Sequence, residues 1–373
     1  MKQIKVLHVQ LTENIGGIES LLINITNQIN NSQYHFDFIA SALSDYQGIL
    51  RQKGSNIIVL PSLTKTIQYI RRFNKILDNN YDIVHFHKNS AINILPVLIA
   101  KVHKTHPKII VHSHNTAPSV NKNKLFILIH KLNRKLMYDM ADIHLACSYK
   151  AARWLYGSRK TIILKNGIDT EKYMYSELSR NRIRKHLNIS PDCFVVGNVG
   201  RLTAQKNHLF LIELFKKIHQ INSNSKLLII GNGVQKPKIL NKIENLKLKK
   251  SVIMLESSDQ IEKYLSAMDA FVMPSTYEGL PISAVEAQAS GLSVYLSDKI
   301  TKEVYLTDHI NDFALSEPVD KIAEKILNTN FNYNRLQQSK MVKKSGYDIR
   351  FTVNKLDELY TQIIKQDNEE ENK

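Results

Sequence analysis

Residues 270–287 read AFVMPSTYEGLPISAVEA, a stretch that joins a predicted strand to a predicted helix. The run Ala270 to Met273 has the length and the apolar character of a buried strand. Pro281 suits the first turn of a helix, where its missing N–H costs no hydrogen bond. Glu278 then falls on the connecting loop, and Glu286 lies about a turn and a half into the helix. Because a helix N-terminus offers unpaired N–H groups and partial positive charge, this junction is suited to binding a phosphate.

Short apolar runs alternate with longer helix-like segments along the rest of the chain. This pattern is typical of a mostly parallel sheet that is covered by helices on both faces. The predicted strands are Ile4 to Val9, Phe36 to Ala40, Ile57 to Leu60, Ile83 to Phe86, Ile109 to His112, Ile143 to Ala146, Ile162 to Leu164, Phe194 to Val199, Leu227 to Ile230, Val252 to Leu255, Ala270 to Met273 and Ser293 to Leu296. The pattern restarts after a polar, charged stretch at residues 170–192, so the sequence predicts an α/β protein with two Rossmann-like, doubly wound domains.

The length of 373 residues is also better suited to two cores than to one. We predict domains at residues 1–169 and 193–345 with a linker at 170–192 between them. A helix is expected in residues 346–366, where apolar residues recur at helical spacing. The acidic tail at residues 367–373 is expected to be disordered. Two α/β domains of this kind would face each other across a cleft, at the carboxyl ends of their strands, where ligands of such folds bind.

Further motifs follow predicted strands. Gly16-Gly17-Ile18-Glu19 comes after the first strand, and its glycines let the backbone approach a ligand closely. Asn166-Gly167-Ile168-Asp169 marks the junction between the halves. Gly200-Arg201-Leu202-Thr203-Ala204-Gln205-Lys206-Asn207 carries two cations, Arg201 and Lys206, at a spacing that can clamp a diphosphate. Gly231-Asn232-Gly233 is a lone Gly-x-Gly turn without the third glycine of a dinucleotide fingerprint, which disfavours an oxidoreductase.

Taken together and in this order, the motifs resemble those of the retaining glycosyltransferases of family 4, which have the GT-B architecture. The resemblance covers residues 4 to 365 and implies that the last helix returns to the N-terminal domain. The run His112-Ser113-His114-Asn115-Thr116 looks closest to bacterial exopolysaccharide and capsule enzymes. The resemblance implies a retaining, metal-independent hexosyltransferase that moves a sugar from a nucleotide donor, with uridine diphosphate as the expected nucleotide, to a lipid-linked saccharide.

The resemblance also assigns roles to individual residues. Arg201 and Lys206 would neutralise the diphosphate as it leaves, the electrostatic work that a metal ion does elsewhere. Glu286 would accept hydrogen bonds from the ribose, and Glu278 would lie beside the transferred sugar. The remaining residues expected at the donor are Gly16, Gly17, Gly231, Gly233, Gly279, Leu280 and Pro281, of which Pro281 has no N–H to give.

Histidines form two His-x-His pairs in the N-terminal half, His85-Phe86-His87 and His112-Ser113-His114. Alternate residues of a strand share a face, so either pair has a geometry that metal ligands use. No third ligand is implied nearby in the sequence, and we therefore expect no metal and no cofactor. His114 matches the family position that faces the donor sugar, which makes it a candidate catalytic residue together with Glu278.

Charge is distributed unevenly. The net charge is +17, of which residues 1–169 carry +13 and the remainder +4. This favours anionic partners such as membrane head groups. The basic, apolar segment 122–137 is either an interfacial helix that lies on an anionic membrane or a helix that covers the core with a charged outer face.

Cys147 and Cys193 fall in opposite halves, which fits a reducing compartment. With no signal-peptide pattern at the start, we expect a cytoplasmic protein, peripheral on the inner face of the membrane.

Two other classes of function are weighed against an enzyme. A glycosyltransferase-like subunit without turnover could support a partner enzyme by binding nucleotide sugar or glycan, but the intact set of Arg201, Lys206, Glu278 and Glu286 argues against it. A nucleic-acid binder would use the basic half, yet no basic motif interleaved with aromatic residues and no zinc finger supports this reading, so nucleic acid is not expected as a partner.

Overall fold

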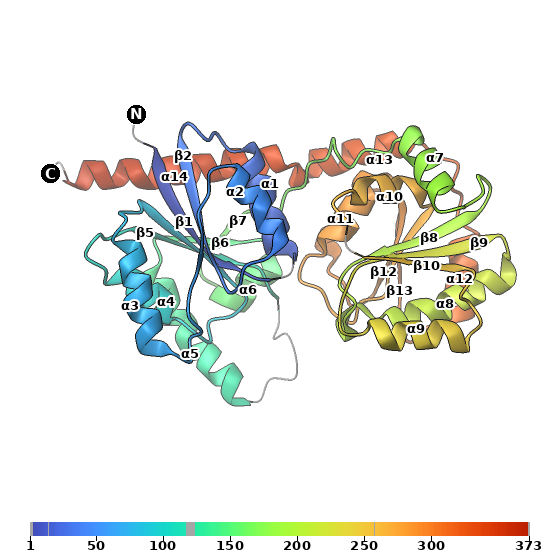
Figure 1. Ribbon diagram of the computed structural model, residues 1–373, viewed down its shortest axis with the longest axis horizontal. Helices are drawn as coiled ribbons and strands as arrows, with labels where there is room; N and C mark the ends of the chain where they lie inside the picture. The colour runs from blue at the N-terminus through green and yellow to red at the C-terminus, as the bar shows by residue number, and fades with distance from the viewer. Residues whose placement is uncertain (1–2, 14, 117–123, 257, 372–373) are drawn as a thin grey trace. The chain divides into compact units, whose positions relative to one another are not determined.

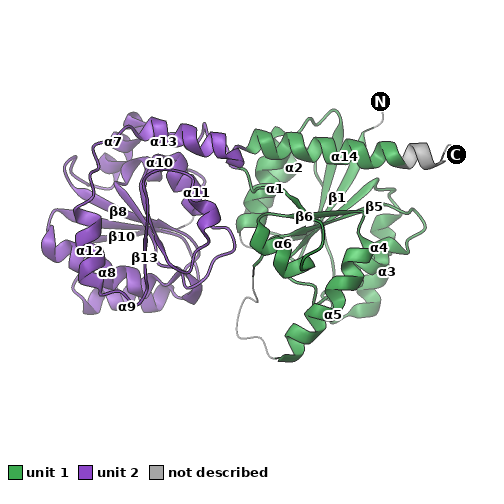
Figure 2. Cartoon of the chain, turned by 180° about the vertical axis from the view of Figure 1, so that it is seen from behind, with its two compact units in different colours: residues 1–167, 349–373 green, residues 168–348 purple. Residues whose placement is uncertain are grey.

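A computed structural model describes residues 3–13, 15–116, 124–256 and 258–371, without the side chains of residues 367–371. The chain divides into two compact units (Figure 2). Unit 1 comprises Met1–Gly167 together with Ile349–Lys373, and unit 2 comprises Ile168–Asp348. Each unit is a parallel sheet with helices on both faces (Figure 1), which confirms the predicted fold class.

Unit 1 contains a seven-stranded sheet with the order β3-β2-β1-β4-β5-β6-β7. Its strands are β1 (Ile4–Leu11), β2 (Tyr34–Ala40), β3 (Ile57–Val59), β4 (Ile83–Lys88), β5 (Lys108–Ser113), β6 (Ile143–Ala146) and β7 (Ile162–Ile163). The strand order reverses between β1 and β4, which pair in parallel with His8 opposite His85. Ligands of doubly wound sheets bind at the carboxyl ends of the strands beside such a switch point.

Unit 2 contains a six-stranded sheet with the order β10-β9-β8-β11-β12-β13. Its strands are β8 (Phe194–Val199), β9 (Ser225–Ile230), β10 (Val252–Leu255), β11 (Ala270–Met273), β12 (Ser293–Ser297) and β13 (Ile310–Phe313). The switch point lies between β8 and β11, where only Val196↔Ala270 and Gly197↔Phe271 are paired in register. The edge strand β13 was missed in the sequence because Asn311 and Asp312 interrupt its apolar pattern.

Helices connect these strands in both units. Those of unit 1 are α1 (Gly17–Gln28), α2 (Gly48–Gln52), α3 (Thr66–Leu77), α4 (Leu95–Lys101), α5 (Lys124–Met140), α6 (Tyr149–Tyr156) and α14 (Ile349–Glu371). Those of unit 2 are α7 (Glu177–His186), α8 (His208–Ile221), α9 (Lys236–Asn245), α10 (Ile261–Ala267), α11 (Ile282–Ala289), α12 (Val319–Leu327) and α13 (Arg335–Val342). Among the described residues, no helix is both long enough and apolar enough to cross a membrane.

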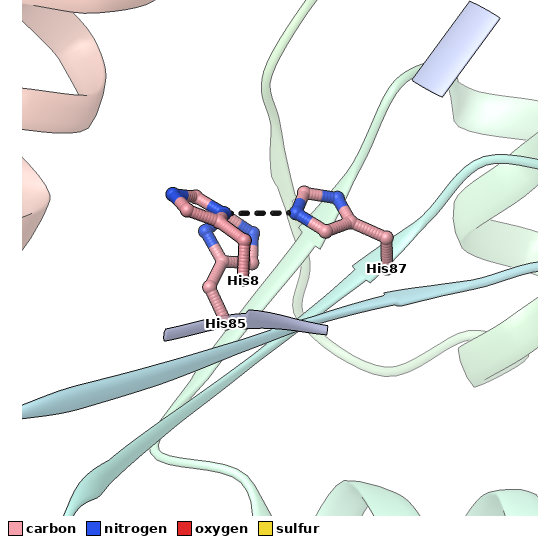
Figure 3. Close-up of side chains that lie close together, drawn as sticks. All are labelled: His8, His85 and His87. Atoms are coloured by element: carbon pink, nitrogen blue, oxygen red, sulfur yellow. Dashed lines mark hydrogen bonds between the residues drawn. The ribbon is translucent and has the colours of Figure 1, made fainter. Parts of the chain in front are cut away.

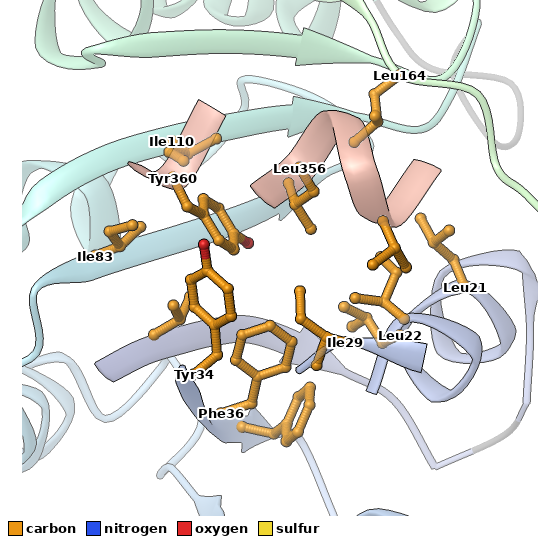
Figure 4. Packing of buried hydrophobic residues seen from close by; sticks show 14 of the residues in the cluster. Leu21, Leu22, Ile29, Tyr34, Phe36, Ile83, Ile110, Leu164, Leu356 and Tyr360 are labelled. Atoms are coloured by element: carbon orange, nitrogen blue, oxygen red, sulfur yellow. The ribbon is translucent and has the colours of Figure 1, made fainter. Parts of the chain in front are cut away.

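The final helix, α14, completes one of the two cores of unit 1. Its residues Leu356 and Tyr360 are fully buried and point into the same cluster as Tyr34 and Phe36 of β2 (Figure 4). The face of the sheet that α14 covers would otherwise expose this cluster to water. The end of the chain, distant in sequence, therefore belongs to the fold of the first 167 residues.

Two boundaries differ from those predicted. The segment 170–192, expected as a linker, contains α7 and belongs to unit 2, because Arg180 and Arg184 both pair with Asp269 at 2.7 Å. The polarity of this segment thus reflects ion pairs and not a loose connection. The tail at 367–373 was expected to be disordered, but the helical backbone of α14 continues to Glu371, and residues 372–373 lie outside the described residues.

Candidate active site

Two loops of unit 2 are joined at the switch point of its sheet. The loop after β8 and the loop after β11 hydrogen-bond through Gln205: the backbone N–H of Thr276 donates to the Gln205 carbonyl oxygen at 2.8 Å. The Gln205 side-chain Nε2 in turn donates to the Tyr277 carbonyl oxygen at 2.9 Å. The structure therefore brings the Gly-Arg-Leu motif and the Glu-Gly-Leu-Pro motif together, although about 70 residues separate them in the chain.

An ion pair lies between these two loops. Lys206 Nζ is 2.8 Å from Glu278 Oε1, and the two side chains are 13% and 8% exposed. A Cβ at Gly200 would lie 3.3 Å from Lys206 Cε, so glycine at this position leaves room for the lysine stem. A lysine held this way places a positive charge in a poorly hydrated place, where it interacts more strongly with an anion than it would in water.

The Gly-x-Gly turn after β9 packs against the backbone of the same loop. A Cβ on Gly231 would come within 2.0 Å of the Gly200 carbonyl oxygen, and one on Gly233 within 2.5 Å of the Leu202 carbonyl oxygen. Both glycines have positive φ angles, of 153° and 156°, which other residues rarely adopt. In this structure the two glycines support the Arg201 loop, because Leu202 N–H also donates to the Asn232 carbonyl oxygen at 2.8 Å.

Glu286, one turn into α11, is partly buried and accepts a hydrogen bond of 2.8 Å from the hydroxyl of Tyr173. Burial raises the pKa of Glu286 above its ordinary value, an effect that the Tyr173 hydrogen bond and the charges of Lys172 and Lys206 oppose. The negative charge of Glu262 adds to the rise. Glu286 therefore lies close enough to Lys206 for their charges to interact.

Unpaired donors surround this pair of glutamates. α11 begins at Ile282 with Pro281 as its N-cap, one position later than predicted, and no side chain caps this terminus. Within the described residues, the backbone N–H groups of Gly279 and Leu280 have no hydrogen-bond partner. Arg201 is exposed, and its guanidinium has no side-chain partner in the part of the chain that the structure describes. The site can therefore accept an anion without breaking an existing bond at these groups.

The β1–α1 turn of unit 1 is held by a buried carboxylate. Glu19 Oε2 accepts from the N–H of Gly16 at 3.0 Å, and Oε1 accepts from the N–H of Thr12 at 3.0 Å. Glu19 is 4% exposed. Gly17 begins α1, so the predicted Gly16-Gly17 pair lies at a helix N-terminus with its loop fixed by Glu19.

Four buried histidines and the partly buried His114 gather on and just after β1, β4 and β5. His8 Nδ1 is 3.1 Å from His87 Nε2, and His87 Nδ1 is 3.0 Å from His114 Nε2. Figure 3 shows how His8 and His87 face each other with His85 beside them. Burial lowers the pKa of His8 and of His114 to about 3, so both rings are neutral at physiological pH. No third ligand was expected beside either His-x-His pair, and this was wrong. In each of two triads, His8-His85-His87 and His87-His112-His114, the nitrogen atoms that could bind a metal lie within 4.8 Å of one another.

Comparison with known proteins identifies the class of this chain. Residues 15–172 match the family described as Glycosyltransferase Family 4, and residues 179–343 match Glycosyl transferases group 1. EpsF of Bacillus subtilis, named as a glycosyltransferase, is 29% identical over 87% of both chains. An Escherichia coli UDP-Gal:alpha-D-GlcNAc-diphosphoundecaprenol alpha-1,3-galactosyltransferase is 25% identical over 97% of this chain and 98% of its own. This chain is a GT-B glycosyltransferase.

The fold of this glycosyltransferase is shared with solved structures at low sequence identity. Anabaena HepE, solved in complex with UDP, superposes with a TM-score of 0.77 at 18% identity, over 96% of this chain and all of its own. WaaG, described as a glycosyltransferase involved in lipopolysaccharide biosynthesis, has a TM-score of 0.66 at 15% identity, over 94% of this chain and 95% of its own. Two doubly wound units are thus common to all three chains.

Several residues of the glycosyltransferase site were missed in the sequence. Tyr173 and Gln205 contact the predicted residues through hydrogen bonds that only folding creates. Asn198 bridges the strands at the switch point, since its Nδ2 donates to the Val272 carbonyl oxygen at 2.7 Å while His208 Nε2 lies 3.0 Å from its Oδ1. Burial lowers the pKa of His208 to about 4, with Lys206 contributing. Gln205 lies within the Gly200–Asn207 motif, but its role was not evident there, because its partners Thr276 and Tyr277 are distant in sequence. No motif marks Tyr173, whose partner Glu286 is also distant in sequence.

Proposed function

We propose that this glycosyltransferase is a retaining enzyme of family 4 that transfers a hexosyl group from a UDP-sugar to a lipid-linked saccharide in the synthesis of a cell-surface polysaccharide. The observation that carries the proposal is the poorly hydrated Lys206–Glu278 pair, which lies within reach of Glu286 and beside free backbone N–H groups. This set offers one cation, two carboxylates and open hydrogen-bond donors in a single place. A nucleoside diphosphate linked to a sugar needs all three kinds of group.

In this proposal, protein groups alone neutralise the negative charge of the departing diphosphate. The poorly exposed Lys206 would bind its oxygens together with Arg201, whose guanidinium has no side-chain partner among the described residues. The N–H groups at the start of α11 would add helix-dipole stabilisation. On binding, Lys206 would exchange Glu278 for phosphate oxygens, and Glu278 would then hydrogen-bond a sugar hydroxyl. Glu286 would accept hydrogen bonds from the ribose, and His114 of unit 1 would hydrogen-bond the donor sugar.

Retention of configuration follows from front-side attack. The acceptor hydroxyl enters on the face that the diphosphate leaves, through an oxocarbenium-like state. The C–O bond to the phosphate breaks as the new C–O bond forms. The leaving phosphate oxygen takes the acceptor's proton, so no protein nucleophile is required. NMR of the product should show the same anomeric configuration as the donor sugar, and an inverted product would contradict this mechanism.

A variant of the buried lysine tests the site. Lys206→Met removes the charge but keeps the apolar stem, and we expect transfer to fall by about 100-fold or more, as when a preorganised oxyanion donor is lost. Lys217→Met is the matched control, because Lys217 lies on α8 in an exposed pair with Asp320. UDP should raise the unfolding temperature of the wild type more than GDP or ADP does. Full activity in Lys206→Met, or activity that a chelator abolishes, would count against the proposal.

An acceptor anchored in a membrane requires the enzyme to reach the bilayer, and helix α5 has the surface for it. Its outward face carries Leu125, Leu128, Leu132 and Leu136, each more than half exposed, with Lys131 and Lys135 between them. This apolar and charged outer face supports the interfacial alternative for the described part of the segment, Lys124–Met140. Residues 122 and 123 lie outside the described residues. A leucine stripe flanked by lysines suits the interface of an anionic membrane, at the inner face of the cell membrane in this proposal.

Vesicle binding tests this part of the proposal. The wild type should sediment with vesicles that contain phosphatidylglycerol and much less with pure phosphatidylcholine. Leu128→Glu/Leu132→Glu should lose this binding while keeping the thermal transition. Leu240→Glu on α9 changes an exposed leucine of unit 2 in the same way and should bind as the wild type does. Equal binding of both variants would exclude α5 as the membrane surface.

A further inference from the structure

Three histidines of unit 1, the buried His8 and His87 and the partly buried His114, form a continuous chain of hydrogen bonds. His114 Nε2 contacts His87 Nδ1 at 3.0 Å, and His87 Nε2 contacts His8 Nδ1 at 3.1 Å. The two ends of the chain, His114 Nδ1 and His8 Nε2, are buried and have no partner among the described residues. Four of the six ring nitrogens therefore make one hydrogen bond each within the chain, and the nitrogen at each end makes none among the described residues.

The chemistry of neutral imidazole restricts this chain to two states. A neutral ring has one N–H donor and one bare acceptor nitrogen. If His114 donates from Nε2, then His87 must donate from Nε2 to His8, and His8 carries its own proton on Nε2. If His8 donates from Nδ1, the same reasoning puts all three protons on Nδ1. The three rings therefore share one tautomer.

Neutrality is supported by the surroundings. Burial is the main cause that lowers the pKa of His87 well below its ordinary value, and the neighbouring histidines lower it further. His8 packs edge-on against Phe36 at 4.7 Å between ring centroids and stacks on Phe38 at 5.2 Å. A doubly protonated ring in this place would be a desolvated cation among apolar and neutral groups.

A metal ion is the other ligand that such a cluster suggests. His87 belongs to both candidate triads, and both of its ring nitrogens are already hydrogen-bonded to other histidines. A metal would have to replace at least one of these bonds. The hydrogen-bonded chain accounts for both contacts of His87 without displacing either.

We propose that His87 and His8 are positioning residues that couple the tautomer of His114 to their own, so that His114 Nδ1 donates or accepts a hydrogen bond according to which nitrogen of His8, two rings away, carries the proton. The functional part of this inference rests on the proposed role of His114 at the donor sugar. When all protons are on Nε2, His114 Nδ1 accepts a bond from a sugar hydroxyl. When all are on Nδ1, it donates one. In either state the His114 ring stays neutral, and its Nδ1 offers the sugar hydroxyl either an acceptor or a donor but not both.

Imidazole NMR of the full-length protein tests the chain without any substrate. With ¹⁵N-labelled histidine, long-range ¹H–¹⁵N correlations distinguish the protonated from the bare nitrogen of each ring. Resonances are assigned by substituting one histidine at a time. We expect His8, His87 and His114 to show the same tautomer at neutral pH. A mixed set of tautomers, or a doubly protonated ring in the chain, would overturn the inference.

A matched pair of variants separates positioning from packing. His8→Phe keeps an aromatic ring against Phe38 but removes the partner of His87 Nε2, and it should shift the ring ¹⁵N resonances of His114, two rings away. His85→Phe is the control: His85 stacks on His87 at 4.4 Å between centroids, but its Nδ1 bonds the Tyr360 hydroxyl, outside the chain. In His85→Phe the resonances of His114 should stay in place. Unchanged His114 resonances in His8→Phe would overturn the proposal.

Activity adds a second readout. We expect His8→Phe to lower transfer about tenfold, the scale of one hydrogen bond, and to leave the UDP-induced thermal shift unchanged. If UDP fails to bind the wild type, the proposed function falls while the NMR result still stands. Stoichiometric zinc or nickel binding by the wild type that is lost in His87→Phe would show a metal site in place of the chain and would overturn the inference.

Discussion

Glu286 is a residue whose position costs stability. Its burial favours the neutral form, whereas hydrogen bonds from a ribose favour the carboxylate. The folded state holds the proton of Glu286 more tightly than the unfolded chain does. The protonated form of Glu286 therefore adds no penalty below the unfolded pKa. As the pH rises through the raised folded pKa, the folded state must bury the charged carboxylate, and this destabilisation is fully present at neutral pH.

Replacing Glu286 by glutamine should therefore separate stability from function. Glu286→Gln keeps an oxygen that can accept from Tyr173 but removes the desolvated charge. We expect its unfolding temperature to be above that of the wild type at about pH 7 and equal to it at about pH 4. UDP affinity should fall about tenfold or more, because a charge-assisted hydrogen bond is lost. Scanning calorimetry and a UDP titration check both effects, and a lower unfolding temperature at pH 7 would contradict the assignment.

Close backbone contact at Gly233 gives a second residue-scale prediction. In Gly233→Ala the new methyl group would lie 2.5 Å from the Leu202 carbonyl oxygen, at a φ of 156°. We expect a loss of about 1–3 kcal/mol or more in the free energy of unfolding, because backbone cannot move aside cheaply. Gly48→Ala is the control, since Gly48 has helical φ and nothing within 4 Å of its added Cβ, and it should be neutral or slightly stabilising. Urea unfolding of both variants measures the difference.

At the scale of elements, α14 shows how one helix serves a core that is distant in sequence. Leu356 is fully buried against the first strands of unit 1, whereas Phe351 on the same helix is 56% exposed. Tyr360 adds a polar anchor to this packing through its bond to His85 Nδ1 at 2.7 Å. The histidine cluster and the last helix of the chain are thus physically connected.

Truncation of these two side chains should have very different effects. Leu356→Ala should destabilise unit 1 by about 2–5 kcal/mol, the usual cost of a cavity left by a buried leucine. Phe351→Ala should change the stability by about 0.5 kcal/mol or less, as is typical of surface positions. Chemical denaturation followed by circular dichroism measures both. Similar losses in the two variants would show that α14 does not pack as described.

Across the whole molecule, most of the histidines whose pKa is strongly lowered by burial lie in unit 1. Burial holds the pKa of His8 and His114 near 3 and that of His85, His87 and His112 well below the ordinary value. In unit 2 the comparable group among the described residues is His208, with a pKa of about 4. For a depressed histidine the stability is present above the unfolded value of 6.5 and is lost as pH falls towards the folded value.

Acidification should therefore unfold unit 1 before unit 2. Each buried neutral histidine lowers the free energy of unfolding by about 1.4 kcal/mol per pH unit below its unfolded pKa. Calorimetry between about pH 7.5 and pH 5.5 should show two unfolding transitions. As the pH falls, the unfolding temperature of one should fall steeply and that of the other should fall less. In His112→Phe about one proton fewer is taken up when unit 1 unfolds, so its unfolding temperature should depend less steeply on pH. A single transition with the same slope in wild type and variant would contradict the assignment of the acid sensitivity to this cluster.

The fold class could be predicted from the amino-acid sequence alone, and so could most of the residues that now make up the candidate site. Alternating apolar runs predict parallel α/β units because a buried strand and an amphipathic helix differ in period. Ligands of such folds bind at the carboxyl ends of the strands, so glycines and charged residues that follow predicted strands are candidates for the site. Only the tertiary structure decided that residues 170–192 belong to unit 2, that Tyr173 and Gln205 serve the site, and that five histidines share one cluster. These features depend on which strands become neighbours across a crossover, and strand order is set by packing of the whole sheet, which no local pattern encodes.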